Sequence, residues 1–105
     1  NDPTFVEAAR TFAQELLSSH AAFPDRLKGG FQRLLARTPT TEEAALLTGL
    51  YQRQLARYRA KPDDAKALLS IGLSPFDAKL DPADLAATTA ITRALLNLHE
   101  TITKY

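Results

Sequence analysis

Two histidines, His20 and His99, carry the most versatile side-chain chemistry in this sequence. A zinc site needs three or four ligands, and no set of His, Asp and Glu residues at helical spacing surrounds either histidine. His99 falls on the apolar side of a predicted helix, where an imidazole bonded to a backbone group is more common than a metal ligand or a general base. The sequence therefore predicts no metal ion and no cofactor in this domain.

The paired carboxylates are placed for structure rather than for catalysis. Asp63-Asp64 and Glu42-Glu43 both fall in predicted first helical turns, where negative charge stabilises the helix dipole. Acid–base catalysis would need carboxylates that converge in a pocket, and no Ser, His and Asp constellation can be assembled from spacing alone. We therefore expect no catalytic residue in this chain.

Gly29-Gly30 is a candidate for a loop that binds phosphate. The pair lacks both glycine spacings that such loops need, G-x-G-x-x-G and G-x-x-x-x-G-K. Gly30 instead shares a helix face with Leu27 and Leu34, which indicates a kink or a close contact with a neighbouring helix.

The strongest charge feature is a run of basic residues, Arg53-x-x-x-Arg57-x-Arg59-x-Lys61. It would suit phosphate groups if all four side chains shared a face, but Arg59 points roughly away from Arg53 and Arg57 at 100° per residue. Cations in a last helical turn also complement the dipole, so we favour a solvated helix end. The net charge of +1, from 13 basic and 12 acidic residues, is small for a protein that binds nucleic acid.

Composition indicates one helical domain. The chain has 105 residues, which fits a single domain, and it has no Cys, which excludes disulfides and thiolate metal sites. Ala and Leu dominate the apolar residues, and this favours helices over strands. No apolar run approaches the roughly 20 residues of a membrane-spanning helix.

Apolar periodicity and capping residues divide the chain into helices. Asp2-Pro3 and Asp81-Pro82 each place a capping Asp before a Pro at the first helical position, and the segment from Thr40 to Glu43 is a capping box. We therefore expect an all-α fold, a compact bundle of about five helices with the first and fifth at its centre. The predicted helices run from about Pro3 to Ser19, Pro24 or Asp25 to Arg37, Thr41 to Arg59, Pro62 to Ser70, and Pro82 to Thr103.

The faces of two segments are also predicted. In residues 73–80, a loop, the apolar side chains are expected to pack down on the bundle; these are Leu73, Phe76 and Leu80. On the first helix, the expected apolar face consists of Phe5, Ala8, Ala9, Phe12, Leu16 and Leu17, and the expected solvent face of Glu7, Arg10, Gln14 and Ser18.

Small residues form a stripe beside the apolar arc of the fifth helix. Its members are Ala83, Ala87, Ala90, Ala94 and Thr101, and a lesser stripe on the third helix consists of Ala45, Gly49 and Ala56. Small side chains permit close helix approach within the bundle, which is one interpretation. The other is a surface on which the rest of a larger polypeptide docks. For that surface we nominate Ala87, Ala90, Ala94, Arg53 and Arg57.

Four stretches of the chain are distinctive: residues 1–10 (NDPTFVEAAR), 34–43 (LLARTPTTEE), 81–87 (DPADLAA) and 95–103 (LLNLHETIT). In this order they resemble the C-terminal region of a family of large secreted planctomycete-type proteins, the domain of unknown function 1553. The resemblance covers nearly the whole chain. Two positions depart from the family pattern. The family commonly has a bulky aromatic residue where this chain has Thr88, and an acid or amide where it has His99.

The resemblance implies a larger, extracytoplasmic parent protein. Members of the family often carry a cytochrome c-like domain upstream of this region. A helix that begins at Asp2-Pro3 agrees with this, so we expect residues 1–105 to be one helical domain from the C-terminal part of a larger protein. The leading functional hypothesis is a non-catalytic interaction or scaffolding module whose partners are other domains of the same polypeptide.

Two alternatives remain open at the level of sequence. One is a helical nucleic-acid-binding or regulatory domain, based on the basic run from Arg53 to Lys61 and the short turn Thr38-Pro39-Thr40. The other is a contribution to an active site that upstream domains complete, for which the candidates are His99 and the loop near Phe76.

Overall fold

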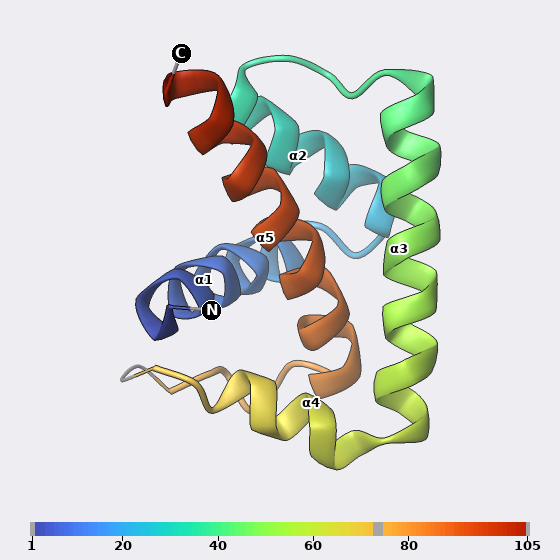
Figure 1. Ribbon diagram of the computed structural model, residues 1–105. Helices are drawn as coiled ribbons and strands as arrows, with labels where there is room; N and C mark the ends of the chain where they lie inside the picture. Colours follow the sequence, from blue (N-terminus) through green and yellow to red (C-terminus); the bar gives the residue numbers. More distant parts are fainter. Residues whose placement is uncertain (1, 73–74, 105) are drawn as a thin grey trace.

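The fold is given by a computed structural model, which describes residues 2–72 and 75–104. Within these residues the chain forms five α-helices and no strand, so the predicted all-α bundle is confirmed (Figure 1). The helices are α1 (Pro3–Ser19), α2 (Phe23–Leu35), α3 (Thr41–Ala60), α4 (Pro62–Leu69) and α5 (Pro82–Lys104).

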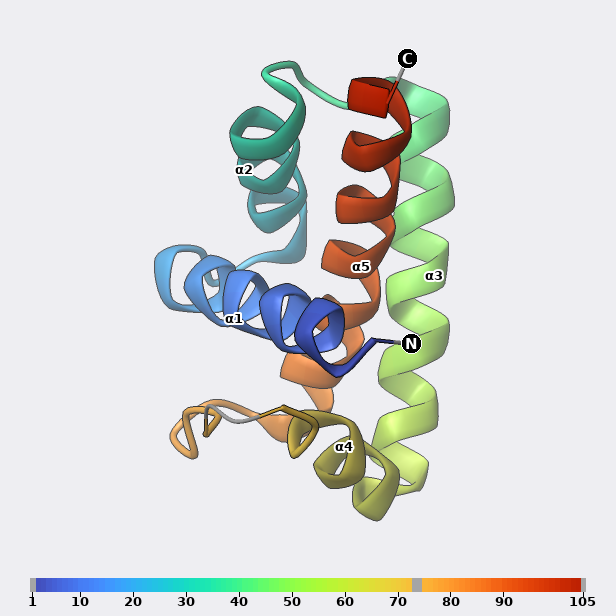
Figure 2. The same ribbon diagram turned by 60° about the vertical axis from the view of Figure 1, so that its left-hand side comes forward.

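Helix α5 is the centre of the bundle and contacts each of the other four helices. Helix α1 crosses α5, whereas α3 runs beside α5 in the opposite direction (Figures 1 and 2). The contacts of α1 and α3 with α5 are the two most extensive in the bundle. The predicted central position of the fifth helix is therefore confirmed, and α3 supports it nearly as much as α1 does.

The predicted caps fix where three helices begin. The carboxylates of Asp2 and Asp81 accept hydrogen bonds from backbone N–H groups two residues further on, at 2.9 and 3.1 Å. In the capping box, the Glu43 N–H donates to the Thr40 hydroxyl at 3.1 Å, and the Thr40 N–H donates to the Glu43 carboxylate at 2.8 Å. These bonds satisfy N–H groups that lack a partner within the first helical turn.

Helix α2 ends at Leu35, earlier than the predicted Arg37. The reason is Ala36, which adopts a left-handed conformation with φ of 54° and terminates the helix. Sequence reasoning did not foresee this, because glycine is the usual residue at such a position and Ala36 has a Cβ atom that disfavours it.

Two apolar clusters lie along α5, one after the other. The first is formed where α1, α3 and α4 meet the beginning of α5, and Phe76 and Leu80 pack against it as predicted. Leu73 lies outside the described residues. The second cluster is formed by Phe23, Leu27 and Phe31 of α2 with Ile91 and Leu95 of α5.

The predicted faces of α1 are partly wrong. Ala8 is exposed, whereas Arg10 is only 2 % exposed. The Arg10 guanidinium donates a 2.8 Å hydrogen bond to the carbonyl of Leu69, at the end of α4, and the Gln14 side chain accepts one of 2.9 Å from the N–H of Asp77. The end of α4 and the following loop therefore cover a side of α1 that periodicity alone assigns to solvent.

Gly30 marks a close contact between helices, as predicted. A Cβ atom at this position would lie 2.9 Å from the Cδ1 atom of Leu95, on α5, and 3.5 Å from a methyl group of Leu16, on α1. Glycine therefore lets α2 approach both helices in the second cluster.

A buried arginine joins four segments of the chain. Arg26, on α2, is 6 % exposed, and its Nη1 atom lies 2.9 Å from both carboxylate oxygens of Asp84, in the first turn of α5. The same guanidinium donates to the carbonyls of His20 and Ala21 at 2.8 and 3.0 Å. The hydroxyl of Tyr51, on α3, donates to Asp84 at 2.6 Å. We call Arg26, Asp84 and Tyr51 the polar cluster.

We expect Arg26→Met to lower the free energy of unfolding by about 3–5 kcal/mol, because the substitution leaves a largely buried carboxylate without its cation. Chemical denaturation measures the change. The matched control is Arg33→Met, on the same helix, whose ion pair with Glu15 is about half exposed on both sides. That variant should change stability by no more than about 1 kcal/mol. Equal losses for both variants would contradict the assigned role of Arg26.

Candidate functional site

The polar cluster is the first place to look for chemistry, because it holds an acid, a base and a phenol. Burial and the hydrogen bond to Asp84 raise the pKa of Tyr51 to about 12. The Tyr51 ring stacks on Phe23, with centroids 4.0 Å apart, and the Thr88 hydroxyl lies 3.4 Å from Asp84. Each charged group thus faces a partner within the domain, so the cluster serves to hold helices together rather than to bind a ligand.

Sequence reasoning missed this cluster. One signal was available on α2, where Arg26 falls on the same stripe as Phe23, Leu27 and Gly30 at spacings of three and four residues. A cation within an apolar stripe indicates a buried partner of opposite charge. Nothing in the local sequence identifies that partner as Asp84, which is 58 residues away.

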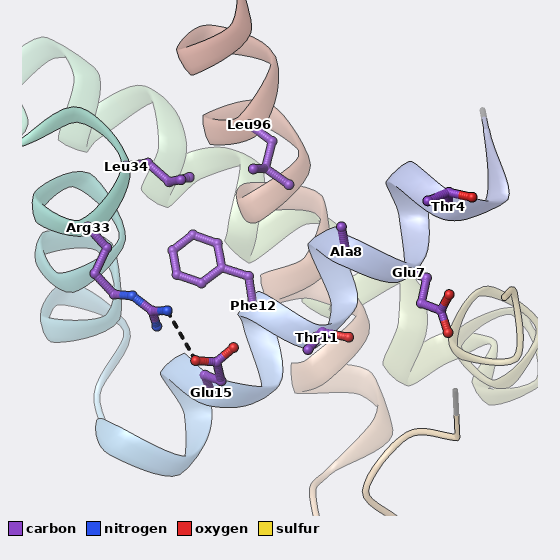
Figure 3. Close-up of a pocket in the computed structure, with 9 residues that line it drawn as sticks. All are labelled: Thr4, Glu7, Ala8, Thr11, Phe12, Glu15, Arg33, Leu34 and Leu96. Carbon is purple, nitrogen blue, oxygen red and sulfur yellow. Dashed lines mark hydrogen bonds and ion pairs between the residues drawn. The ribbon is translucent and has the colours of Figure 1, made fainter. Parts of the chain in front are cut away.

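A groove lies between α1, α2 and α5 (Figure 3). It has a volume of about 550 Å³. Its floor is apolar, since the ring of Phe12 lies between α1 and the side chains of Leu34 and Leu96. Its wall on α1 carries exposed small and polar residues. The full lining is Thr4, Glu7, Ala8, Thr11, Phe12 and Glu15 of α1, Arg33 and Leu34 of α2, and Leu96 of α5.

An ion pair closes one end of this groove. A terminal nitrogen of Arg33 lies 3.1 Å from the Glu15 carboxylate, and the guanidinium carbon lies 4.7 Å from the centre of the Phe12 ring. Both charged side chains are about half exposed, at 52 % and 53 %. An exposed pair of this kind costs little to open, so an incoming group can displace it.

A second, smaller hollow of about 230 Å³ lies between α3 and α5, above Phe31 of α2. Ala94 and Leu98 line it from α5, and Leu46 and Leu47 line it from α3. Leu46 is 70 % exposed, more than Ile71 and Ile102, the other large apolar side chains that are exposed in the described part of the chain. Periodicity did not single out Leu46, because the neighbouring Leu47 fits the core stripe.

The residues nominated from sequence for a docking surface differ in their burial. Ala87 is completely buried in the first apolar cluster, so it cannot form part of an exposed docking surface. Ala90 and Ala94 are partly buried, and only Ala94 lines the hollow beside Leu46. Close packing thus accounts for Ala87, because α3, α4 and α1 cover the beginning of α5 on several sides.

The basic run does not form one continuous patch. Arg57 lies 3.9 Å from Asp64, and Arg59 lies 3.2 Å from Asp81 on another side of α3. Arg53 is exposed, and no described residue forms an ion pair with it. Two of the four cations are therefore already matched by carboxylates, which leaves Arg53 and Lys61 without an ion pair among the described residues.

His99 and the loop near Phe76 do not share a cleft in this domain. Phe76 packs against the cluster that contains Leu85, near the beginning of α5. His99 lies 14 residues further along the same helix, a distance of about 21 Å at 1.5 Å per residue. A single small site cannot include both residues.

Other features of the described residues limit the classes of site. No group of three or more His, Cys, Asp and Glu side chains there is arranged to hold a metal ion. No described helix has the length and apolar character needed to cross a bilayer.

Comparison of the chain with protein-family models, with curated proteins and with solved structures yields no match.

The raised pKa of Tyr51 predicts a specific loss of stability in alkali. The folded-state pKa of about 12 exceeds the unfolded value of about 10, so the protonated phenol stabilises the fold fully below pH 10. This contribution is lost as the pH rises from 10 to 12. We expect unfolding curves of the wild type to shift more over this range than those of Tyr51→Phe. The phenolate absorbance of the wild type should show one ionisation near pH 12. This ionisation should be absent from Tyr51→Phe and present in Tyr58→Phe.

Proposed function

We propose that this domain is a non-catalytic interaction module, and that the groove between α1, α2 and α5 receives apolar side chains from another part of the same polypeptide. The observation that carries the proposal is the open apolar floor made by Phe12, Leu34 and Leu96. Binding sites are commonly concave and apolar, with a few polar groups that fix orientation. Thr4 and Thr11, on the wall, and the pair Glu15–Arg33 would supply those polar groups.

The position of the groove favours a partner that precedes the domain. The lining begins at Thr4, in the first turn of α1, so a domain joined ahead of α1 would lie close to it. The resemblance to secreted proteins with several domains supports the same partner and an extracytoplasmic setting. In this role the domain has no turnover of its own, and it positions or stabilises the domains that do.

The partner segment should be apolar with a hydrogen-bonding edge. Ala8 is exposed at the middle of the α1 wall and offers room for a side chain above Phe12. Opening the exposed ion pair would free the Arg33 guanidinium for a carboxylate or carbonyl of the partner. An apolar residue next to an acceptor group therefore matches the groove best.

We expect Ala8→Arg to weaken the binding of this domain to the preceding part of its parent polypeptide at least about tenfold, equivalent to about 1.4 kcal/mol. The added side chain would fill the groove without entering the core. Titration calorimetry with the two parts as separate proteins measures the effect. Ser18→Arg, also exposed on α1 but outside the groove, is the matched control and should bind as the wild type does.

Absence of binding, or an equal effect of both substitutions, would contradict the groove as the docking site. Turnover of a substrate by the isolated domain would contradict the non-catalytic role. Circular dichroism of each variant confirms that the helices are retained.

A further inference from the structure

An exposed flank of α3, beside its core side, carries a row of four residues whose order is acid, leucine, glycine and base. They are Glu42, Leu46, Gly49 and Arg53. Spacings of four, three and four residues place them on one stripe of a helix. The stripe is about 16 Å long at 1.5 Å per residue. It borders the core side of α3, because Leu50 lies four residues after Leu46, and Leu46 itself lines the hollow between α3 and α5.

The two charges of this stripe have no ion-pair partner among the described residues. Arg33, Arg37, Arg57 and Arg59 each lie within 4 Å of a carboxylate. Neither Glu42 nor Arg53 forms an ion pair with any described residue, although both are exposed.

Gly49 leaves a notch between these charges. A Cβ atom at Gly49 would meet only one side chain within 4 Å, the terminal nitrogen of Arg53 at 3.2 Å. The notch is therefore covered by nothing except a long, mobile guanidinium. If Arg53 turned toward an external carboxylate, the notch would be open to an apolar side chain.

This order of residues is complementary to itself when a second copy lies antiparallel. A two-fold axis at the midpoint of the stripe places Glu42 of one copy opposite Arg53 of the other, and Leu46 of one copy opposite Gly49 of the other. Each contact then occurs twice, as an isologous interface requires. Leucine fills the notch at glycine, and the ion pairs flank it on both sides.

We infer that α3 mediates a weak, antiparallel homodimer through Glu42, Leu46, Gly49 and Arg53. The occupant of this face is a second copy of the chain, because in that arrangement both unmatched charges meet opposite charges and the exposed leucine meets the notch at Gly49. A single helix pair buries less than the roughly 1,200 Å² of standard stable interfaces, so the association is reversible and depends on concentration. The α1–α2–α5 groove lies elsewhere on the domain. Docking in that groove and dimerisation through α3 can therefore be tested independently.

Sedimentation equilibrium of the wild-type domain tests the dimer over concentrations that reach about 1 mM, where even a millimolar dissociation constant leaves dimer populated. Glu42→Arg and Arg53→Glu should each weaken association at least about tenfold, because like charges then meet twice across the two-fold axis. An equimolar mixture of the two variants should recover the wild-type association as a heterodimer, since each unlike pair is restored. Circular dichroism should show unchanged helix content for each variant alone.

A substitution without charge gives a second, independent readout. Gly49→Leu should abolish association, because the new side chain fills the notch, whereas leucine is a better helix former than glycine and preserves α3. Gln52→Arg, exposed on α3 about 100° from Arg53, is the matched control and should leave association unchanged. A monomeric wild type at every concentration, a charge-variant mixture that fails to associate, or a Gly49→Leu protein that still dimerises would overturn the proposal.

Discussion

The ion pair between Arg26 and Asp84 is the constraint on which the arrangement of this bundle depends. One guanidinium holds the connection between α1 and α2, through the carbonyls of His20 and Ala21, against the first turn of α5. Through Asp84 it also holds Tyr51 of α3. A buried charge is costly without its partner, so alternative packings that separate these helices are strongly disfavoured. The pair therefore disfavours other ways to assemble the same apolar faces.

The free surfaces of the domain follow from this central position of α5. Because four helices surround α5 and no helix covers all of α1 and α2, a groove remains where α1, α2 and α5 meet. Helix α3 packs on α5 along only one side, so the rest of its surface carries exposed residues such as Arg53, and Leu46 lies at the edge of the hollow beside α5. The core and the surfaces available for binding are thus two results of the same packing.

Much of the fold was predictable because its signals are local. The beginnings of α1, α3 and α5 follow from Asp2, the Thr40–Glu43 box and Asp81, whose bonds span only two or three residues. The errors concern contacts between distant segments. Arg10 was assigned to solvent because its partner, the carbonyl of Leu69, is 59 residues away, and Ala87 was nominated as a surface residue although three helices cover it. Likewise, the groove combines residues of three helices, and no stretch of sequence contains its pattern.

The contact between Arg10 and Leu69 bears on how the domain opens and closes. Helix α4 has only eight residues, too few to persist alone in water, and its last turn is held by a buried side chain from α1. Detaching α4 would leave the Arg10 guanidinium without that carbonyl and would uncover Leu69 and Ala65 of the first cluster. Local unfolding of this short helix is thereby linked to unfolding of α1 and α5, so its amides gain protection from the global stability of the domain rather than from their own helix. The segment with the weakest intrinsic helicity need not be the segment that opens first.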